Sequence, residues 1–377
     1  MRILIVLTYY TPYMSGVTEY ARMLAEDLAD RHEVTVLTTQ HDPTLPTEDR
    51  INGVRVIRAP VFARLHKGVL SWRFIARFAS LAHSHDVVNL HLPMLESGFL
   101  SLLLPRKKLV VNYQCDMAVV GGLLDRLAVT VTRFSCLLAV RRSRAVGVIT
   151  QDYANSSDWL TFSRSKQLEV LAPMKHMPAS QRPRRSDGVF RFGFVGRFVA
   201  EKGLPVLLKA FADVQRVHEG EVVLVLVGDI HSVAGGGIID DIHGAISALG
   251  GAIEVRGRIS DEELQEFYGE LDVLVLPSVN RYEAFGMVQL EAMLGGALVI
   301  SSDLPGVRTI VGNTGNGRIV PANDAASLAE AMEASILDRT KISREEVRAQ
   351  ALDAYPQRRF FELQEALLTK DPRVLGP

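Results

Sequence analysis

Short runs of valine, isoleucine and leucine alternate along this chain with longer amphipathic stretches. The short runs are almost continuously apolar, which is typical of parallel strands covered by helices on both faces. Alternation of such strands with helices predicts a doubly wound α/β fold. The predicted strands are Arg2–Thr8, Glu33–Thr39, Val54–Arg58, Asp86–Leu90, Lys108–Gln114, Ala145–Thr150, Gln167–Ala172, Phe190–Gly196, Val222–Gly228, Ala252–Arg256, Asp272–Pro277, Ala297–Ser301 and Gly317–Pro321.

One segment, Pro173–Gly188, interrupts this alternation. Its three prolines and many polar residues are typical of a linker between domains. We therefore expect an N-terminal domain over residues 1–178, a second domain over 179–355 and a final helical segment over 356–377. The predicted helices are Glu19–Ala29, Leu123–Arg142, Pro205–His218, Asp261–Leu271, Met287–Leu294, Ala325–Leu337 and Tyr355–Thr369.

Each predicted domain contains a parallel sheet, and the loops that follow its strands are the expected place for chemistry. Ligands of such sheets bind outside the carboxyl ends of the strands. Two sheets that end facing one another form a cleft between them. We therefore expect the functional residues in loops near the domain boundary.

Composition narrows the class of protein. The 377 residues are 47% hydrophobic and 23% charged, an ordinary globular mixture. The longest apolar runs, such as Phe99–Leu104 and Val222–Val227, are shorter than the ~18–20 residues that a membrane span requires. Cys115 and Cys136 give no disulfide framework, and no signal-peptide pattern opens the sequence. We therefore expect a cytoplasmic protein.

Charge is unevenly distributed, with a net charge of +6 through residue 178 and −7 beyond it. This asymmetry is either chance or a sign that the first half contacts an anionic surface. Two stretches of that half, Phe62–Phe78 and Leu123–Arg144, mix apolar side chains with cations. They suit peripheral contact with the anionic inner face of a membrane. The alternative is that both are helices packed on their own sheet, with solvated cations.

The first motif is Gly196–Gly203 (GRFVAEKG). A predicted strand ends at Gly196, Arg197 and Lys202 follow within six residues, and Pro205 opens a helix. At a strand end, arginine binds a diphosphate as a bidentate fork and lysine binds it as a point charge. A surface loop with two solvated cations is the alternative interpretation.

The second motif runs from Ser278 to Gly296. Glu283 precedes a helix expected to begin near Gly286, and Glu291 lies about one turn inside that helix. A helix start offers N–H donors and a positive dipole end to a diphosphate. The two carboxylates are then roughly 10 Å apart, which suits the two ends of a long polar ligand and not a proton-sharing pair. Stabilisation by the helix dipole is the alternative for Glu283, whereas an unpaired, buried Glu291 would be costly.

The E-x7-E spacing of these glutamates, within EAFGMVQLE, resembles the signature of glycosyltransferase family 4. Gly196–Gly203 resembles the family's G-R-x3-E-K-G segment. Further segments that resemble the family in order and spacing are Val227–Asp229, Asp261–Leu264, Asp272–Ser278 and Gly317–Pro321. The resemblance implies a GT-B fold, with two Rossmann-like domains facing across a cleft and a C-terminal helix that crosses back to the N-terminal domain. It also implies sugar transfer with retention of configuration.

The resemblance implies roles for individual residues of the second domain. Arg197 and Lys202 match the cations that bind the donor diphosphate. Glu283 matches the carboxylate on the donor-sugar hydroxyls, and Glu291 the carboxylate on the ribose hydroxyls. The positions whose backbone is implied to face the sugar and the diphosphate are Phe285, Gly286 and Met287.

Two positions of the first domain depart from the family pattern. Tyr13–Val17 resembles the family's P-x-x-G-G-V loop, with Ser15 in place of the first glycine, and Gly16 lets the backbone approach phosphates. Gln114 stands where the family usually has a histidine near the reacting sugar. A glutamine forms hydrogen bonds but carries no proton. Either Gln114 orients the sugar as a neutral group, or the enzyme is weak or inactive.

Two more residues of the first domain are candidates for acceptor binding. His91 ends a predicted strand, where it either contacts the acceptor or is a strand-end histidine with ordinary partners. Asp116, two residues after Gln114, is a candidate by position alone.

No D-x-D pair, which commonly holds a metal on the donor diphosphate, occurs in the sequence. We therefore expect no metal and no cofactor. The expected substrates are a UDP- or GDP-type hexose donor and, as acceptor, a glycan, a lipid-linked glycan of polysaccharide biosynthesis or a small molecule. Nucleic acid is not an expected partner. The alternatives are a sugar-nucleotide epimerase on the same fold and a non-catalytic subunit that binds a sugar nucleotide.

Overall fold

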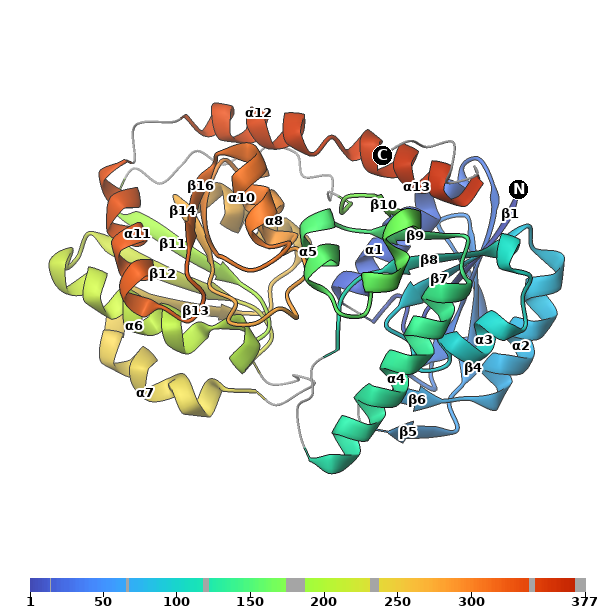
Figure 1. Ribbon diagram of the computed structural model, residues 1–377. Helices are drawn as coiled ribbons and strands as arrows, with labels where there is room; N and C mark the ends of the chain where they lie inside the picture. The colour runs from blue at the N-terminus through green and yellow to red at the C-terminus, as the bar shows by residue number, and fades with distance from the viewer. Residues whose placement is uncertain are drawn as a thin grey trace. The chain divides into compact units, whose positions relative to one another are not determined.

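A computed structural model describes residues 1–13, 15–65, 68–117, 122–173, 187–230, 237–338 and 343–369. It divides into two compact units (Figure 1). The first unit comprises Met1–Pro173 with Gln357–Pro377, and the second comprises Met174–Pro356. Most of the predicted linker Pro173–Gly188 lies outside the described residues.

The first unit is built on an eight-stranded sheet of order β10-β9-β8-β7-β1-β2-β4-β3. Every neighbouring pair in this sheet is parallel except β3 with β4. Its strands are β1 (Arg2–Val6), β2 (Glu33–Gln40), β3 (Glu48–Ile51), β4 (Val54–Pro60), β7 (Val87–Leu92), β8 (Leu109–Tyr113), β9 (Ala145–Val148) and β10 (Gln167–Glu169). A separate small hairpin pairs β5 (Ala63–Leu65) with β6 (Gly68–Leu70).

Helices of the first unit cover this sheet (Figure 1). They are α1 (Gly16–Ala29), α2 (Trp72–Ser84), α3 (Ser97–Leu102), α4 (Leu123–Arg142), α5 (Gln151–Ser156) and α13 (Gln357–Thr369), with short 3-10 turns at Arg106–Lys108 and Thr161–Lys166. A core cluster of this unit contains buried apolar side chains of β1, β2, β4, β7, β8, β9, α1 and α13, including Ile3, Ile5, Leu24 and Val36. Sequence-distant segments therefore share one hydrophobic core.

The C-terminal helix α13 completes the first unit, as the family resemblance implies. Phe360 and Leu367 are fully buried in the core of that unit, and the Phe360 ring meets the Tyr20 ring edge-on with centroids 5.2 Å apart. Gln364 is fully buried, donates from Nε2 to the Tyr20 hydroxyl and accepts from Asn112 Nδ2 at 3.1 Å. These contacts join α13 to α1 and to β8.

The second unit is built on a six-stranded parallel sheet of order β13-β12-β11-β14-β15-β16. Its strands are β11 (Phe190–Val195), β12 (Val222–Val227), β13 (Ile253–Gly257), β14 (Val273–Leu276), β15 (Leu298–Ser302) and β16 (Gly317–Val320). Its helices are α6 (Leu204–Val217), α7 (Ile239–Leu249), α8 (Asp261–Glu270), α9 (Val288–Leu294), α10 (Arg308–Thr314), α11 (Ala325–Leu337) and α12 (Arg344–Ala354), with 3-10 turns at Ala200–Lys202 and Gly250–Ala252.

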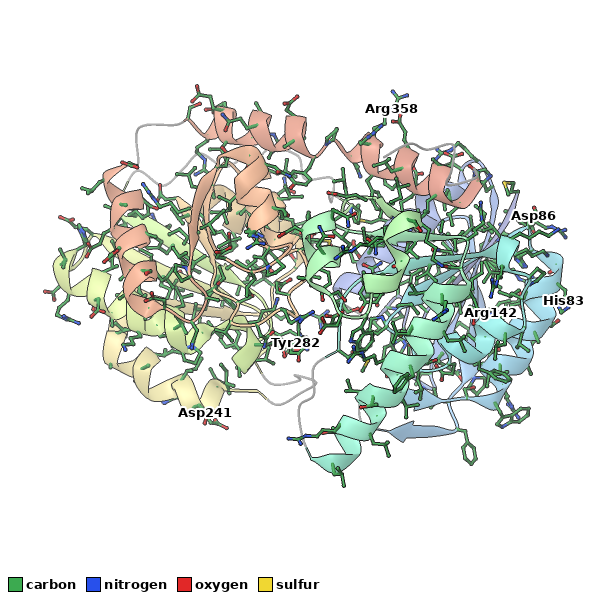
Figure 2. All side chains as sticks on the ribbon, in the orientation of Figure 1. His83, Asp86, Arg142, Asp241, Tyr282 and Arg358 are labelled. Atoms are coloured by element: carbon green, nitrogen blue, oxygen red, sulfur yellow. The ribbon has the colours of Figure 1, made fainter. Side chains whose placement is uncertain are left out.

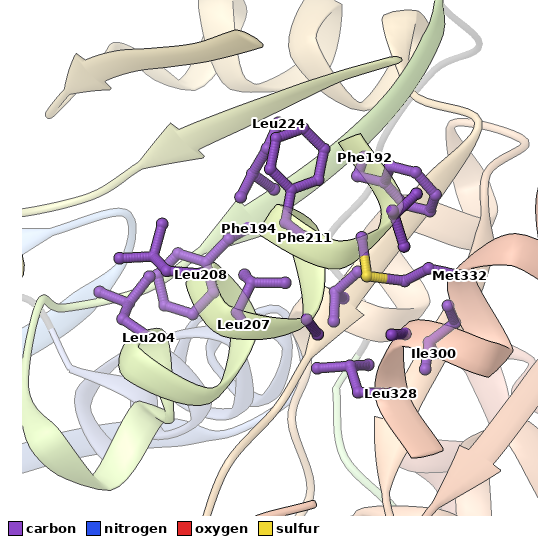
Figure 3. Close-up of a cluster of buried hydrophobic side chains, with 14 of the residues drawn as sticks. Phe192, Phe194, Leu204, Leu207, Leu208, Phe211, Leu224, Ile300, Leu328 and Met332 are labelled. Atoms are coloured by element: carbon purple, nitrogen blue, oxygen red, sulfur yellow. The ribbon is translucent and has the colours of Figure 1, made fainter. Parts of the chain in front are cut away.

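Figure 3 shows the core between this sheet and the helices α6 and α11. Phe192 of β11 meets Phe211 of α6 at a centroid distance of 6.3 Å, and Leu328 and Met332 of α11 join the same cluster. The strand order reverses between β11 and β14, which are neighbours although two strands separate them in sequence. Such a reversal opens a crevice at the carboxyl ends of the two strands, where ligands of α/β sheets bind.

The apolar runs predicted the strands of both large sheets except β3. Glu48–Ile51 (EDRI) contains three charged residues and lies at the sheet edge, so no apolar run marks it. The helices α3, α5, α7, α10 and α12 are additional to those predicted, and most of α2 lies in the stretch Phe62–Phe78, for which a helix packed on the sheet was one of two interpretations. The helices α3, α5 and α10 have only six or seven residues, which is too short for an amphipathic repeat to be clear.

Candidate donor site in the second unit

The first motif forms the loop between β11 and α6, at the reversal of strand order. Gly203 ends the 3-10 turn with φ of +72°, and a Cβ there would lie 1.9 Å from the carbonyl oxygen of Pro277. Glu201 supports the same contact, since its carbonyl accepts from the Val279 N–H at 3.1 Å. We call Gly196–Gly203 the cation loop. Because Gly203 has no side chain, this loop packs directly against the end of β14, where the second motif begins.

The structure brings Lys202 and Glu283 together across these two loops. Lys202 Nζ forms an ion pair with Glu283 Oε2, although 81 residues separate them in sequence. Their side chains are 20% and 17% exposed, so the pair is largely shielded but open to solvent. Arg197 lies at the start of the same loop, where its Nη2 pairs with Glu201 Oε1 at 3.0 Å. Two cations and two carboxylates thus meet at the carboxyl ends of β11 and β14.

The second motif continues from this loop into α9. Gly286 has φ of +78°, and a Cβ there would lie 2.4 Å from Leu276 Cδ2. Phe285 is buried, and its carbonyl accepts from Gln289 Nε2 at 3.0 Å. Gln289 is fully buried and also donates to the Val307 carbonyl at 3.1 Å. The predicted helix start is confirmed, with Met287 as N-cap.

Gln289 is a residue that the sequence reasoning missed. It holds the backbone of Phe285 in place, next to the positions predicted to face the donor. A glutamine inside an apolar helix face is the signal that marks it, because buried amides require partners.

Glu291 is the fourth residue of α9 and lies in its first turn. Its Oε2 accepts a hydrogen bond of 2.7 Å from the Tyr268 hydroxyl. Tyr268 belongs to α8 and is fully buried, and burial together with the Glu291 carboxylate raises the pKa of Tyr268 well above its ordinary value. Tyr268 was also missed, because a Phe-Tyr pair on an amphipathic helix is typical of a core face. A partly buried carboxylate on the neighbouring helix is the signal for such a partner.

In the first unit, the structure brings His91 and Gln114 together. Gln114 directly follows β8 and lies beside His91 of β7, with Nε2 of Gln114 3.3 Å from Nδ1 of His91. Burial lowers the pKa of His91 to about 3, so its ring is neutral at physiological pH. The ring also meets Tyr20 edge-on, with centroids 5.8 Å apart. Its Nε2 atom is buried and has no hydrogen-bond partner within the described part of the chain, and contact of His91 with an acceptor stays a prediction.

Asp116 belongs to a buried network of hydroxyl groups. Its Oδ1 accepts from the Tyr113 hydroxyl and, at 2.7 Å, from Ser157 Oγ, while its N–H donates to the Tyr153 hydroxyl at 2.7 Å. Burial, followed by the Asp116 carboxylate, raises the pKa of Tyr113. Asp116 is itself buried within this network, and its role in acceptor binding stays a prediction.

The loop before α1 explains the departure at Ser15. Ser15 is the N-cap of α1, and its Oγ accepts from the Thr18 N–H at 3.2 Å. Its φ of −157° is extended backbone, which any residue adopts, so no glycine is needed there. Serine is a favoured N-cap residue. Gly16 is the first residue of the helix, which begins three residues before the predicted start at Glu19. Met14 of the same loop lies outside the described residues.

The part of the chain that the structure describes contains no cluster of three or more His, Cys, Asp or Glu side chains arranged to hold a metal ion. Among the same residues, no helix combines the length and the apolar character needed to cross a membrane.

Two family models match consecutive parts of the chain. Residues 15–174 match "Glycosyl transferase 4-like domain", and residues 179–353 match "Glycosyl transferases group 1". The first range includes Gln114, and the second includes both donor motifs.

Relatives with assigned names resemble almost the whole chain. The phosphatidyl-myo-inositol mannosyltransferase of Mycolicibacterium smegmatis is 26% identical over 353 residues, which cover 88% of this chain and 84% of the relative. The D-rhamnosyltransferase WbpZ of Pseudomonas aeruginosa is 28% identical over 345 residues, which cover 87% and 85%. An uncharacterized glycosyltransferase of Methanocaldococcus jannaschii is 26% identical and covers 90% of both chains.

Solved GT-B structures share the fold of the entire chain. Sucrose-phosphate synthase from Thermosynechococcus elongatus aligns with a TM-score of 0.71 at 20% identity, over 99% of this chain and 98% of that chain. Anabaena Alr3699/HepE, solved with UDP and glucose, aligns with a TM-score of 0.72 at 18% identity, over 98% and 99%. The motifs at the reversed strands, the two matching family models and the shared fold agree, and the chain belongs to glycosyltransferase family 4.

Proposed function

We propose that this glycosyltransferase moves a hexose from a nucleoside-diphosphate sugar to an acceptor, with retention of anomeric configuration and without a metal ion. The observation that carries the proposal is the Lys202–Glu283 ion pair at the carboxyl ends of β11 and β14. A cation for the diphosphate and a carboxylate for the sugar hydroxyls are adjacent there. We propose that the second unit binds the donor and that the first unit binds the acceptor.

Each group in the donor site has a distinct proposed role. Arg197 and Lys202 neutralise the diphosphate, and Glu283 accepts hydrogen bonds from donor-sugar hydroxyls. Glu291 accepts from the ribose hydroxyls. The α9 helix has only seven residues, so its dipole is short, and the two side-chain cations supply most of the positive charge.

The proposed chemistry requires no protein base. The bond between the anomeric carbon and the phosphate oxygen breaks as the acceptor oxygen bonds to that carbon on the same face. The proton of the acceptor hydroxyl passes to the departing phosphate oxygen. Stabilisation of the developing negative charge on that phosphate is therefore the main contribution of Arg197 and Lys202. A neutral Gln114 is compatible with this reaction, because it only has to orient a substrate.

The donor is identified first, by thermal shift with UDP, GDP, ADP and their sugars. The fold relative HepE was solved with UDP-glucose, which makes the uridine nucleotides the first choice. Product analysis then compares the donor alone with the donor plus an acceptor, in buffer containing EDTA. We expect an acceptor-dependent glycoside whose anomeric configuration, read by NMR, equals that of the donor.

Other results of this experiment identify the competing functions. Epimerised donor sugar without acceptor indicates an epimerase, and binding without any product indicates a non-catalytic subunit. Complete loss of transfer in EDTA, restored by Mg²⁺ or Mn²⁺, contradicts the metal-independent reaction. An inverted anomeric centre contradicts retention.

Replacement of Gln114 by alanine is expected to lower kcat by about tenfold or more while nucleotide affinity stays within twofold. Gln114 belongs to the first unit, so it is proposed to orient a reacting sugar and not the nucleotide. Kinetics and nucleotide titration on the same preparation separate the two effects. Unchanged turnover would remove Gln114 from the site. Cys115→Ala, at the half-buried next residue, is the matched control.

We also propose that the chain is a cytoplasmic protein that contacts an anionic membrane through α4. The exposed apolar side chains of this helix are Leu123, Leu127, Val131, Phe134 and Leu138, which are 82%, 59%, 48%, 66% and 37% exposed. At about 100° per residue, all five lie within an arc of about 80°. The residues on the opposite face, such as Cys136 and Ala139, are buried against the first unit.

The five exposed apolar side chains of α4 form a stripe, and arginines lie beside it. Arg126 and Arg133 are exposed along one edge of it, and Arg141 is exposed near its end. Asp125, the acidic residue of α4, lies on the far side of the helix. Arg142 is not part of the stripe, because it donates to the carbonyls of Ser101 and Leu104 at 3.0 and 3.1 Å. Apolar residues flanked by arginines suit an anionic lipid surface.

The other stretch predicted to contact a membrane, Phe62–Phe78, does not form a comparable exposed apolar surface in its described part. Phe74 and Phe78 of α2 are buried, as in a helix packed on its own sheet, while Trp72 is exposed. Residues 66–67 lie outside the described residues. The membrane proposal therefore rests on α4. The lipid named in phosphatidyl-myo-inositol mannosyltransferase, a relative of this chain, is consistent with it.

Vesicle sedimentation tests this surface. We expect binding to vesicles of phosphatidylcholine with phosphatidylglycerol, and at least about tenfold weaker binding for R126E/R133E, because each arginine near the surface contributes roughly 1 kcal/mol. L127S/F134S should lose binding as well, whereas L337S, at an exposed leucine of the second unit, should not. Equal binding to vesicles without anionic lipid contradicts the proposal. Self-association that only L127S/F134S abolishes, without vesicle binding, assigns the stripe to a second copy of the chain.

A further inference from the structure

The hydrogen bond between Tyr268 and Glu291 joins two helices of the second unit. Tyr268 is fully buried near the end of α8, whereas Glu291 on α9 is partly exposed. The phenol hydroxyl donates to Glu291 Oε2 at 2.7 Å. One end of the interaction is therefore fixed in the core, and the other lies at the edge of the candidate donor site.

We propose that Tyr268 is a positioning residue that holds the Glu291 carboxylate in the orientation that accepts the hydroxyls of the donor's ribose. The inference rests on the proposed function, in which Glu291 binds the ribose. It adds a residue that has no contact with the nucleotide and that controls discrimination between ribose and deoxyribose.

The packing around Tyr268 fixes its position. A Cβ on Gly295, just after α9, would lie 2.8 Å from the carbonyl carbon, the carbonyl oxygen and the Cβ of Tyr268. The end of α8 can therefore approach the end of α9 this closely only because residue 295 has no side chain. A larger residue there would push the phenol away from Glu291.

Arg344 of α12 holds the ends of α8 and α9 together. Its guanidinium donates to the carbonyls of Gly269 at 2.9 Å and Leu271 at 2.6 Å, and also to the carbonyl of Gly295. These carbonyls lie in or directly after the last turns of the two helices, where backbone acceptors have no partner within the helix. Three elements thus determine where the Tyr268 hydroxyl lies.

The chemistry of the pair gives the phenol one fixed role. Burial and the adjacent carboxylate raise the pKa of Tyr268, so its hydroxyl remains protonated and donates at every pH at which the enzyme works. A carboxylate offers about four acceptor positions, and the phenol occupies one of them. It thereby limits rotation of the Glu291 side chain, and pre-orientation of this kind lowers the cost of binding.

The test compares ribonucleotides with deoxynucleotides on the full chain. UDP, GDP and their 2′-deoxy and 3′-deoxy forms are titrated against the wild type and Tyr268→Phe. We expect the wild type to prefer the ribonucleotide of the base it binds by about tenfold or more, as loss of a hydrogen bond to a charged group predicts. Tyr268→Phe should reduce this preference at least about threefold, by weakening ribonucleotide binding while the Kd of the deoxy form stays within about twofold.

Matched variants separate positioning from stability. Tyr20→Phe removes a buried, hydrogen-bonded hydroxyl from the first unit and should leave the preference unchanged. Gly295→Ala, which displaces Tyr268, should reduce the preference as Tyr268→Phe does. When Glu291 is already replaced by glutamine, Tyr268→Phe should cause no further loss of the preference for the ribonucleotide, because the two residues act as one unit.

The contrary results are distinguishable. If Tyr268→Phe weakens both nucleotide forms equally, or changes only the melting temperature, the positioning role is wrong while the proposed function stands. If the wild type binds both forms equally, the assignment of Glu291 to the ribose is wrong and the inference fails with it. If the wild type binds neither UDP nor GDP in any form, the proposed donor class itself is wrong.

Discussion

Replacement of Lys202 by alanine is expected to lower kcat/KM for sugar transfer by about 10²- to 10³-fold, the range found when one charge-stabilising group is removed from an active site. Two effects add in the same direction. The departing diphosphate loses a cation, and Glu283, whose side chain is only 17% exposed, loses its partner and repels the phosphates. Steady-state kinetics with the donor found by thermal shift measures the change.

Lys209→Ala is the matched control for this prediction. Lys209 is an exposed residue of α6, one helix turn or more beyond the cation loop, and its loss should leave kcat/KM unchanged. In the double variant Lys202→Ala/Glu283→Ala the losses should be less than additive, because the two residues form one ion pair. A loss of less than threefold in Lys202→Ala would contradict the role of this cation in transfer.

Replacement of Phe360 by alanine is expected to reduce the free energy of unfolding of the first unit by about 3–5 kcal/mol, as for other fully buried phenylalanines. Phe360 belongs to α13 yet is buried in the core that α1 and β1 share, against Tyr20. The loss combines the transfer of an aromatic ring to water with the cavity that remains.

Tryptophan fluorescence during urea unfolding measures this effect selectively. Both tryptophans of the sequence, Trp72 and Trp159, belong to the first unit, and Trp159 is buried. Arg358→Ala on the same helix is the control, since its side chain extends into solvent (Figure 2) and its pair with Glu362 is exposed. An unchanged tryptophan transition in Phe360→Ala would mean that α13 contributes little to the stability of the first unit.

The sequence predicted the positions of the candidate donor residues in the fold better than it predicted the residues that support them. Arg197, Lys202, Glu283 and Glu291 stand in loops or first turns at strand ends, so spacing along the chain indicates their place in space. The Lys202–Glu283 ion pair follows from the reversal of strand order between β11 and β14, which no local pattern encodes.

Supporting residues were harder to predict because they resemble core residues. Tyr268 and Gln289 lie on buried helix faces, and only the packing of α8, α9 and the loop before α10 shows what their polar atoms contact. For Asp116, the sequence indicates the position of the residue but not its hydrogen-bond partners. Its position after β8 predicts an acceptor ligand, whereas no sequence pattern indicates its hydrogen bonds with the hydroxyl groups of Tyr113, Tyr153 and Ser157. Contacts between distant segments create both arrangements.

The return of α13 to the first unit makes the second unit an insertion within the first. A ribosome releases Met174–Pro356 before α13, so the second unit has all of its strands and helices while the first still lacks Phe360, Gln364 and Leu367. Domains generally fold as units during synthesis. The second unit is therefore expected to fold first during synthesis. The first unit, which is the proposed acceptor-binding unit, is expected to become stable only after α13 has been synthesised.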